Sequence, residues 1–100
     1  MNREVYRYVI DQKIPMHEIE ATLDLAVVAV ESLHGATCVR LDARYSTDDA
    51  KHACVIDTAT IVGADLNRIF TGYLRQEFGD DSFKVERINS MPASPHMAVS

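Results

Sequence analysis

The sequence predicts an α+β domain in which a four-stranded antiparallel sheet carries two helices on one face. Two segments have apolar residues at helical spacing, and each of them ends beside a glycine. Shorter segments rich in β-branched and aromatic residues come before, between and after the two helices. A cluster of turn-forming residues divides the middle segment into two strands. The predicted element order is therefore βαββαβ.

The first strand is predicted over residues 4 to 11, where valine, tyrosine and isoleucine favour extended structure. The first helix is predicted from Met16 to about His34. Pro15 suits the turn that begins a helix, and Gly35 suits the turn that ends one. The stripe that we expect to face the sheet consists of Ile19, Leu23, Ala26, Val27, Val30 and Leu33.

The middle segment predicts a hairpin. Residues 37 to 45 alternate between two faces, a turn is expected at residues 46 to 49, and residues 52 to 58 form the next strand. Pairing Tyr45 with His52 gathers apolar side chains on one face and joins opposite charges on the other. This register places Leu41 opposite Ile56, Arg40 opposite Asp57, and Asp42 opposite Val55.

A second amphipathic helix is predicted from residue 63 or 64 to Phe78, and Gly79 is expected to end it. The last strand is predicted over residues 82 to 88. The apolar stripe of this helix consists of Leu66, Ile69, Phe70, Tyr73, Leu74 and Phe78.

The predicted order is that of the ferredoxin-like arrangement, a two-layer α+β sandwich. Right-handed crossovers then give the strand order 4-1-3-2, with the first hairpin strand at an edge. Residues 1–88 are expected to form a single domain. Residues 89–100 contain two prolines and small side chains, so we expect a disordered C-terminal tail there.

Composition excludes several classes of partner. The net charge of −5 argues against binding nucleic acid, whose affinity comes largely from lysine and arginine at phosphates. No apolar stretch approaches the ~20 residues of a membrane-spanning helix. Cys38 and Cys54 form no CxxC motif and are expected on opposite faces of the sheet. These features predict a cytoplasmic protein with reduced thiols and without membrane or nucleic-acid partners.

No motif in the chain predicts catalysis. The four histidines lack the spacing of a metal site, and no HExxH sequence is present. Cys54 is expected in the core, and Cys38 has only Arg40, two residues away on the same face, as a candidate for activating a thiolate, so its reactivity stays open. We therefore expect no catalytic residue, no metal and no cofactor.

Two surfaces are candidates for an interaction. Besides its core stripe, the first helix carries Leu25 and Val28, although a helix on a sheet needs only one apolar stripe. Either this helix is wedged deeply against the second helix, or these residues form a surface for self-association.

The open face of the sheet is the second surface. It is expected to carry Arg40, Asp42, Arg44 and Asp57. The first strand adds either Tyr6 and Tyr8 or a Val5-Arg7-Val9 set, and periodicity does not decide between them. Outward tyrosines would suit a planar ligand or a dimer, whereas outward valines would give a mixed apolar and charged dimer surface.

The sequence predicts a small non-enzymatic interaction or regulatory module that self-associates, as a homodimer, or binds another protein. The alternative is a small enzyme or ligand-sensing domain whose pocket forms at the subunit interface or on the open sheet face. The candidate residues for either role are Tyr6, Tyr8, Leu25, Val28, Arg40, Asp42, Arg44 and Asp57.

Overall fold

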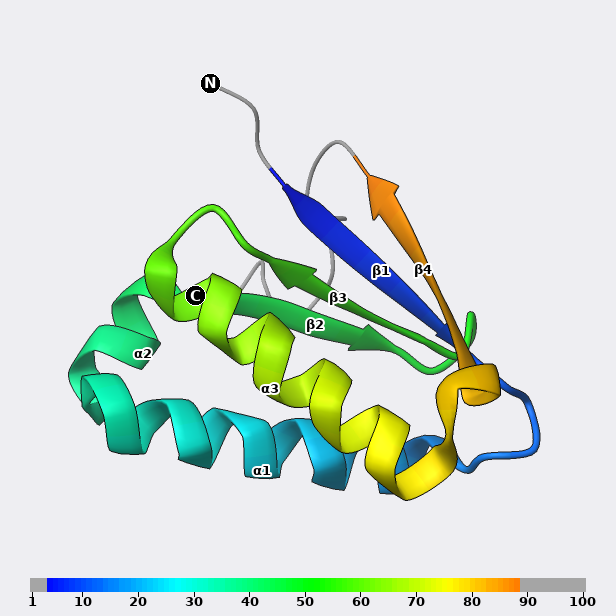
Figure 1. The fold of residues 1–100 in the computed structure, drawn as a ribbon. Coiled ribbons are helices and arrows are strands. Elements are labelled where there is room, and N and C mark those ends of the chain that lie inside the picture. Colours follow the sequence, from blue (N-terminus) through cyan, green and yellow to red (C-terminus); the bar gives the residue numbers. More distant parts are fainter. Residues whose placement is uncertain (1–3, 89–100) are drawn as a thin grey trace.

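The computed structural model describes residues 4–88, and the predicted tail at 89–100 lies outside them. The described chain forms four strands and three α-helices (Figure 1). The elements are β1 (Val5–Ile10), α1 (Met16–His34), α2 (Ala36–Asp42), β2 (Arg44–Asp48), β3 (Ala53–Asp57), α3 (Ile61–Phe78), a 3₁₀ turn (Asp80–Ser82) and β4 (Phe83–Ile88). The α+β class is confirmed, with one helix more than the sequence predicted.

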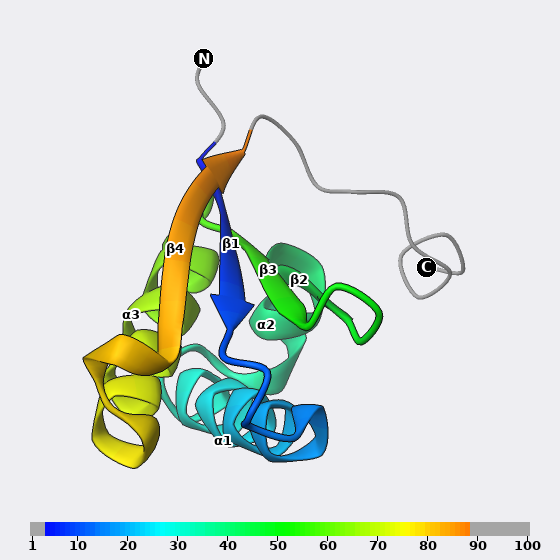
Figure 2. The ribbon, with the colours of Figure 1, turned by 90° about the vertical axis from the view of Figure 1, so that its right-hand side faces the viewer.

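All neighbouring strands in the sheet are antiparallel, and their order is β2-β3-β1-β4. This is the predicted order 4-1-3-2, read from the opposite edge. Helices α1 and α3 lie side by side and antiparallel along one face of the sheet, as Figure 1 shows. The side view in Figure 2 shows the described helices gathered on that side.

The sequence allowed two orientations for β1, and the structure has the one in which the tyrosines face the helices. Tyr6, Tyr8 and Ile10 belong to the core beneath the helices, where Tyr8 and Ile10 are buried. Side chains alternate along a strand, so Val5, Arg7 and Val9 lie on the opposite, open face. Helices α1 and α3 each contribute one apolar stripe to this core, and α2 contributes a single residue. The buried residues from the helices are Ile19, Leu23, Ala26, Val30, Val39, Val62, Leu66, Phe70 and Leu74.

The prediction of a strand over residues 37 to 45 is wrong for most of its length. Ala36–Asp42 forms the short helix α2, and β2 begins only at Arg44. In this helix Val39 is buried in the core, whereas Leu41 is 73% exposed. Burial of Val39 beside the end of α1 outweighs the strand propensity of this segment, because β propensity depends strongly on tertiary context.

The predicted hairpin register is also wrong, by four residues. Tyr45 pairs with Ile56, not with His52, and Arg44 pairs with Asp57. An even shift keeps each side chain on its predicted face, so the register partner of Asp57 is Arg44 in place of Arg40. The predicted turn residues 46 to 48 are in β2, and the chain reverses at Asp49–His52, where His52 has a φ of 55°.

Helix ends follow ordinary capping chemistry. Gly35 and Gly79 end α1 and α3 with φ values of 88° and 89°, as predicted. The Oγ1 atom of Thr60 accepts a hydrogen bond from the Gly63 N–H at 3.0 Å, so α3 begins two residues before the predicted start. Gly63 lies so close to β3 that a Cβ atom there would be 2.1 Å from the carbonyl oxygen of Asp57.

Within residues 4–88, no single helix is both long and apolar enough to cross a membrane. Helices α1 and α2 pass that test by length and composition only when taken together, and the chain bends by 116° between them.

Candidate functional site

The outer face of α1 carries exposed apolar residues. At 100° per residue, Ala21, Leu25, Val28 and Ser32 lie opposite the buried stripe of Ile19, Leu23, Ala26 and Val30. Leu25 is 63% exposed and Val28 is 57% exposed. Leu33, which was predicted to belong to the core stripe, is instead 67% exposed near the C-terminal end of α1. The Ser32 hydroxyl donates to the Val28 carbonyl at 3.1 Å, so it is satisfied within the helix. We call Ala21, Leu25, Val28 and Ser32 the α1 stripe.

The α1 stripe contains no charged residue. The acidic residues Asp24 and Glu31 lie on the edge of α1 that faces β2, where their charges raise the pKa of Tyr45 after the larger effect of its burial. The sequence left open whether Leu25 and Val28 pack against the second helix or lie at the surface, and the structure places both at the surface. The alternative, in which α3 covers them, does not fit exposures above one half.

A groove of about 450 Å³ runs between α1 and α3 beside Leu25. Its floor and walls combine apolar side chains with two acidic residues at the rim. The residues are Glu18, Ala21, Thr22, Leu25, Tyr73, Gln76, Glu77 and Phe78. The groove therefore extends the α1 stripe toward the C-terminal half of α3.

The outer face of α3 adds residues that the sequence reasoning missed. Arg68, Gly72 and Arg75 are all exposed there. Arg68 and Arg75 are seven residues apart, which is two helical turns, and this spacing could have revealed a basic row. Gly72 lies between them in the middle of the helix, and a Cβ atom at this position would have no neighbour within 4 Å. No contact within the described chain therefore requires a glycine at this position.

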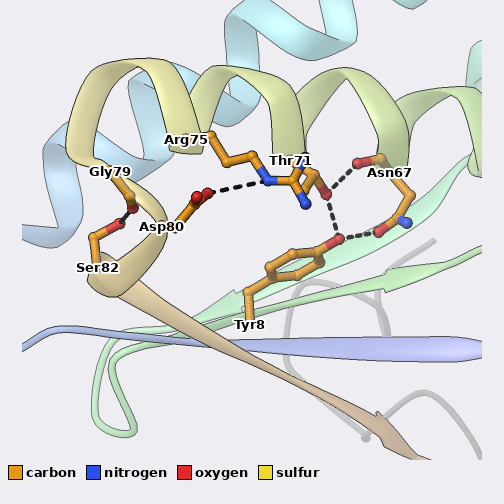
Figure 3. Close-up of polar contacts among 7 residues, drawn as sticks. All are labelled: Tyr8, Asn67, Thr71, Arg75, Gly79, Asp80 and Ser82. Atoms are coloured by element: carbon orange, nitrogen blue, oxygen red, sulfur yellow. Dashed lines mark hydrogen bonds and ion pairs between the residues drawn. The ribbon is translucent and has the colours of Figure 1, made fainter.

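Arg75 also takes part in a contact with the turn before β4. Its Nε lies 3.2 Å from Oδ1 of Asp80, and both side chains are largely exposed (Figure 3). An exposed pair of this kind contributes about 0–1 kcal/mol. The contact holds Arg75 on the edge of α3 that is remote from α1.

Two of the predicted sheet-face residues lie together as expected. Arg44 and Asp57 are register partners on β2 and β3. Asp57 is only 3% exposed, and its Oδ1 accepts a hydrogen bond from the Ala59 N–H at 2.9 Å. Asp57 therefore stabilises the turn between β3 and α3, while Arg44 is exposed at the sheet edge.

The centre of the open sheet face is already buried. Val5, Ala53 and Val55 are at most 2% exposed. Beside them, Arg7 and Glu86 form an ion pair of 3.5 Å between β1 and β4. This face therefore has less accessible apolar surface than the α1 stripe.

Arg40 and Asp42 do not lie on the sheet, contrary to prediction, because their segment is helical. Both are exposed on α2. Arg40 lines a cavity of about 310 Å³ between α1, α2 and β2, together with Glu31 and Tyr45. The carbonyl of Asp42 accepts a hydrogen bond from the Thr60 hydroxyl at 3.0 Å, which joins α2 to the start of α3.

The interpretation of Tyr6 and Tyr8 as an outward ligand surface is wrong. Tyr6 packs against the core, and Tyr8 is 1% exposed. The Tyr8 hydroxyl donates to Oδ1 of Asn67 and lies 2.6 Å from Oγ1 of Thr71 (Figure 3). Burial raises the pKa of Tyr8. These contacts give Tyr8 a structural role between β1 and α3.

A pair of carboxylates connects α1 to the hairpin. Burial raises the pKa of Glu20, and so do its hydrogen bond with Asp49 and the negative charges of Asp49 and Asp24. The Thr47 hydroxyl donates to Oε2 of Glu20 at 3.5 Å, and this hydrogen bond lowers the pKa of Glu20. Among residues 4–88, no group of acidic, histidine or cysteine side chains has the arrangement of a metal site.

The two thiols differ strongly in environment. Cys38 is exposed on α2, whereas Cys54 is buried in the core. Burial raises the pKa of Cys54 to about 12, and nearby Glu20 and Asp49 add to the shift. Cys54 is therefore an inert core residue.

The chain matches no protein-family model, no curated protein and no solved structure.

Proposed function

We propose that this protein is a small non-enzymatic interaction module that self-associates as a homodimer through the α1 stripe. The proposal depends mainly on the exposure of Leu25 and Val28, at 63% and 57%, on a helix whose opposite side is packed into the core. Burying one such side chain fully stabilises an assembly by about 1.5–3 kcal/mol. A partner surface is therefore the physical role that best fits the stripe.

The size of the chain fits such an interface. A stable complex buries about 800 Å² on each partner, which is about one eighth of the accessible surface of 6434 Å² here. The chain measures 34 × 27 × 25 Å, so its helix layer offers a face of the required extent. A two-fold dimer uses the same patch on both copies, and the uncharged centre of the stripe is compatible with contact with itself.

The helix layer is a better candidate than the open sheet face, the other surface considered from the sequence. Val5, Ala53 and Val55 on the sheet are at most 2% exposed and have little more area to lose on association. In contrast, Leu25 and Val28 of the α1 stripe are each more than half exposed. The ferredoxin-like order, interrupted here by α2, leaves α1 and α3 free along one whole side for this contact.

The exposed thiol of Cys38 supports a reducing, cytoplasmic location for the module.

A ligand-sensing domain is the second candidate, and the groove between α1 and α3 favours it. Its volume of about 450 Å³ lies within the range of small-molecule sites. Thermal-shift screening would support this reading if a ligand raised Tm in the parent chain and not after Ala21→Trp, which fills the groove. The groove lies beside Leu25, so a ligand and a second copy would compete for it.

Sedimentation velocity tests the proposed self-association. The unmodified chain is expected to sediment as a dimer, and Val28→Glu as a monomer, because a charge would be buried at the centre of the interface. Leu41→Glu is the matched control: Leu41 is 73% exposed but lies on α2. A parent chain that is monomeric, or a dimer that is insensitive to Val28→Glu, would overturn the proposal.

A further inference from the structure

We infer that the second copy docks with its two-fold axis parallel to α1 and α3, so that α1 of each copy lies on α3 of the other. This inference rests on the proposed self-association and adds the relative orientation of the two copies. The orientation follows from the placement of two acidic residues on α1 and two basic residues on α3, together with an unexplained glycine on α3.

The helices run antiparallel in a defined register. Near one end, Nε2 of His34 on α1 lies 2.7 Å from Oδ2 of Asp65 on α3. Further along, Thr22 and Glu77 line the same groove. Counting in opposite directions from the His34–Asp65 contact places Arg68 level with Glu31 and Arg75 level with Asp24.

These four charges form two matching rows. Asp24 and Glu31 are seven residues apart, as are Arg68 and Arg75. Each row therefore spans two turns, or about 10 Å along its helix. The two rows have the same spacing and lie at the same height along the helix axes. Both acidic residues of one copy can therefore contact the two basic residues of the other copy at once.

The rows lie on opposite edges of the helix layer. Asp24 and Glu31 are on the β2 side of α1, where their charges act on Tyr45. Arg75 is on the β4 side of α3, where it pairs with Asp80. A 180° rotation about an axis parallel to the helices exchanges the two edges, so the acidic row of each copy meets the basic row of its partner.

The same charges disfavour the alternative dimer, in which the two-fold axis is perpendicular to the helices. An axis perpendicular to the helices would stack α1 on α1 and bring the two acidic rows together. Like charges facing each other across an interface reduce affinity. Charge complementarity therefore selects the parallel axis.

Gly72 provides the close approach that this arrangement requires. It lies between Arg68 and Arg75, one residue from the level of Val28, and the space beyond its Cα is open. A glycine inside a helix costs about 1 kcal/mol relative to alanine, and no contact within the described chain explains that cost. In the proposed dimer, Val28 of the second copy packs over the exposed backbone of Gly72.

Charge reversal tests the orientation. The variant Arg68→Glu/Arg75→Glu and the variant Asp24→Arg/Glu31→Arg are each expected to raise the dimer Kd about tenfold or more at low salt. A swapped chain that carries all four substitutions should regain the dimer. It should not mix with the unmodified chain, since that mixed pair opposes like charges. Lys84→Glu on β4, a charge reversal at an exposed residue opposite Val9 on the open sheet face, and Asp80→Asn, which removes only the contact with Arg75, serve as controls.

Native mass spectrometry of the mixed chains separates the outcomes. Free mixing of swapped and unmodified chains, or reversals without effect in a dimer that Val28→Glu still dissociates, would overturn the parallel axis and leave the self-association intact. A monomeric parent chain would overturn both. Gly72→Gln is an independent check that keeps every charge, and it is expected to weaken the dimer about tenfold or more.

Discussion

His34 and Asp65 join the last turn of α1 to the first turns of α3 through an Nε2–Oδ2 contact of 2.7 Å. Both side chains are about one quarter exposed, so the pair lies at the surface boundary of the helix layer. It defines the register of the two antiparallel helices. The same register aligns Asp24 with Arg75 and Glu31 with Arg68, and it therefore underlies the proposed dimer.

Two glycines of α3 are expected to respond in opposite ways to alanine. Gly63→Ala should reduce the free energy of unfolding by about 1–3 kcal/mol, because its Cβ would be 2.1 Å from the Asp57 carbonyl oxygen. Gly72→Ala should increase it by about 0.5–1 kcal/mol, since the added Cβ meets open space. Urea unfolding in a Val28→Glu background separates these effects from association. Equal effects at both positions would contradict the described packing.

Removal of the Tyr8 hydroxyl is expected to reduce the free energy of unfolding without changing the fold. Tyr8→Phe leaves Oδ1 of Asn67 and Oγ1 of Thr71 without their buried partner, which costs about 1–2 kcal/mol. Tyr6→Phe is the matched control on the same strand and should change stability by less than about 0.5 kcal/mol. Similar losses for both variants in urea unfolding would argue against this role of Tyr8.

The two cysteines should react at very different rates. With a pKa of about 12, Cys54 is a thiolate in roughly one molecule in ten thousand at pH 8 and is also buried. Titration with a thiol reagent should therefore modify Cys38 alone in the native protein and both residues in denaturant. Rapid native modification of Cys54 in a Cys38→Ser variant would show that the core opens around β3.

Glu20 is expected to make stability depend on pH. Its raised pKa means that the folded state holds this proton more tightly than the unfolded state. The resulting stabilisation is complete below the ordinary glutamate pKa and is lost as pH rises through the raised value. Glu20→Gln should therefore increase the free energy of unfolding at pH 7 by about 0.5 kcal/mol, because its repulsion with Asp49 and Asp24 disappears. An equal increase in the free energy of unfolding at a pH below the ordinary glutamate pKa would contradict this explanation.

The long amphipathic helices were predictable because periodicity and terminal glycines agreed. Met16–His34 was correctly bounded, and Gly35 and Gly79 have the positive φ values that only glycine adopts easily. The strand order followed from the alternation of strands and helices. The excess of apolar residues on α1 indicated Leu25 and Val28 as candidates, but periodicity did not decide between their exposure and their burial against α3.

The segment around α2 was not predictable from local pattern. Val39 and Leu41 alternate with polar residues as in a strand, yet only Val39 reaches the core. Its helical conformation depends on tertiary contacts at the end of α1, which a local pattern does not contain. The role of Tyr8 was hidden for a related reason, since its hydroxyl is satisfied by Asn67 and Thr71, which are distant in sequence.

The α3 contribution to the candidate surface was missed because each of its residues is unremarkable alone. Arg68 and Arg75 are ordinary surface residues until the antiparallel register sets them level with Glu31 and Asp24. Gly72 is informative only once its surroundings are known to be empty. Such relations require the packing of two helices and not the periodicity of one.

Sedimentation equilibrium of the unmodified chain at about 100 µM is the direct test of the proposed homodimer, because a dimer with a Kd near 1 µM would be almost fully formed there. Self-association through the α1 stripe predicts a molar mass near twice the 11.2 kDa of the single chain. It also predicts a return toward the single-chain mass for Val28→Glu under the same conditions. A mass of 11.2 kDa for the unmodified chain at this concentration would contradict it.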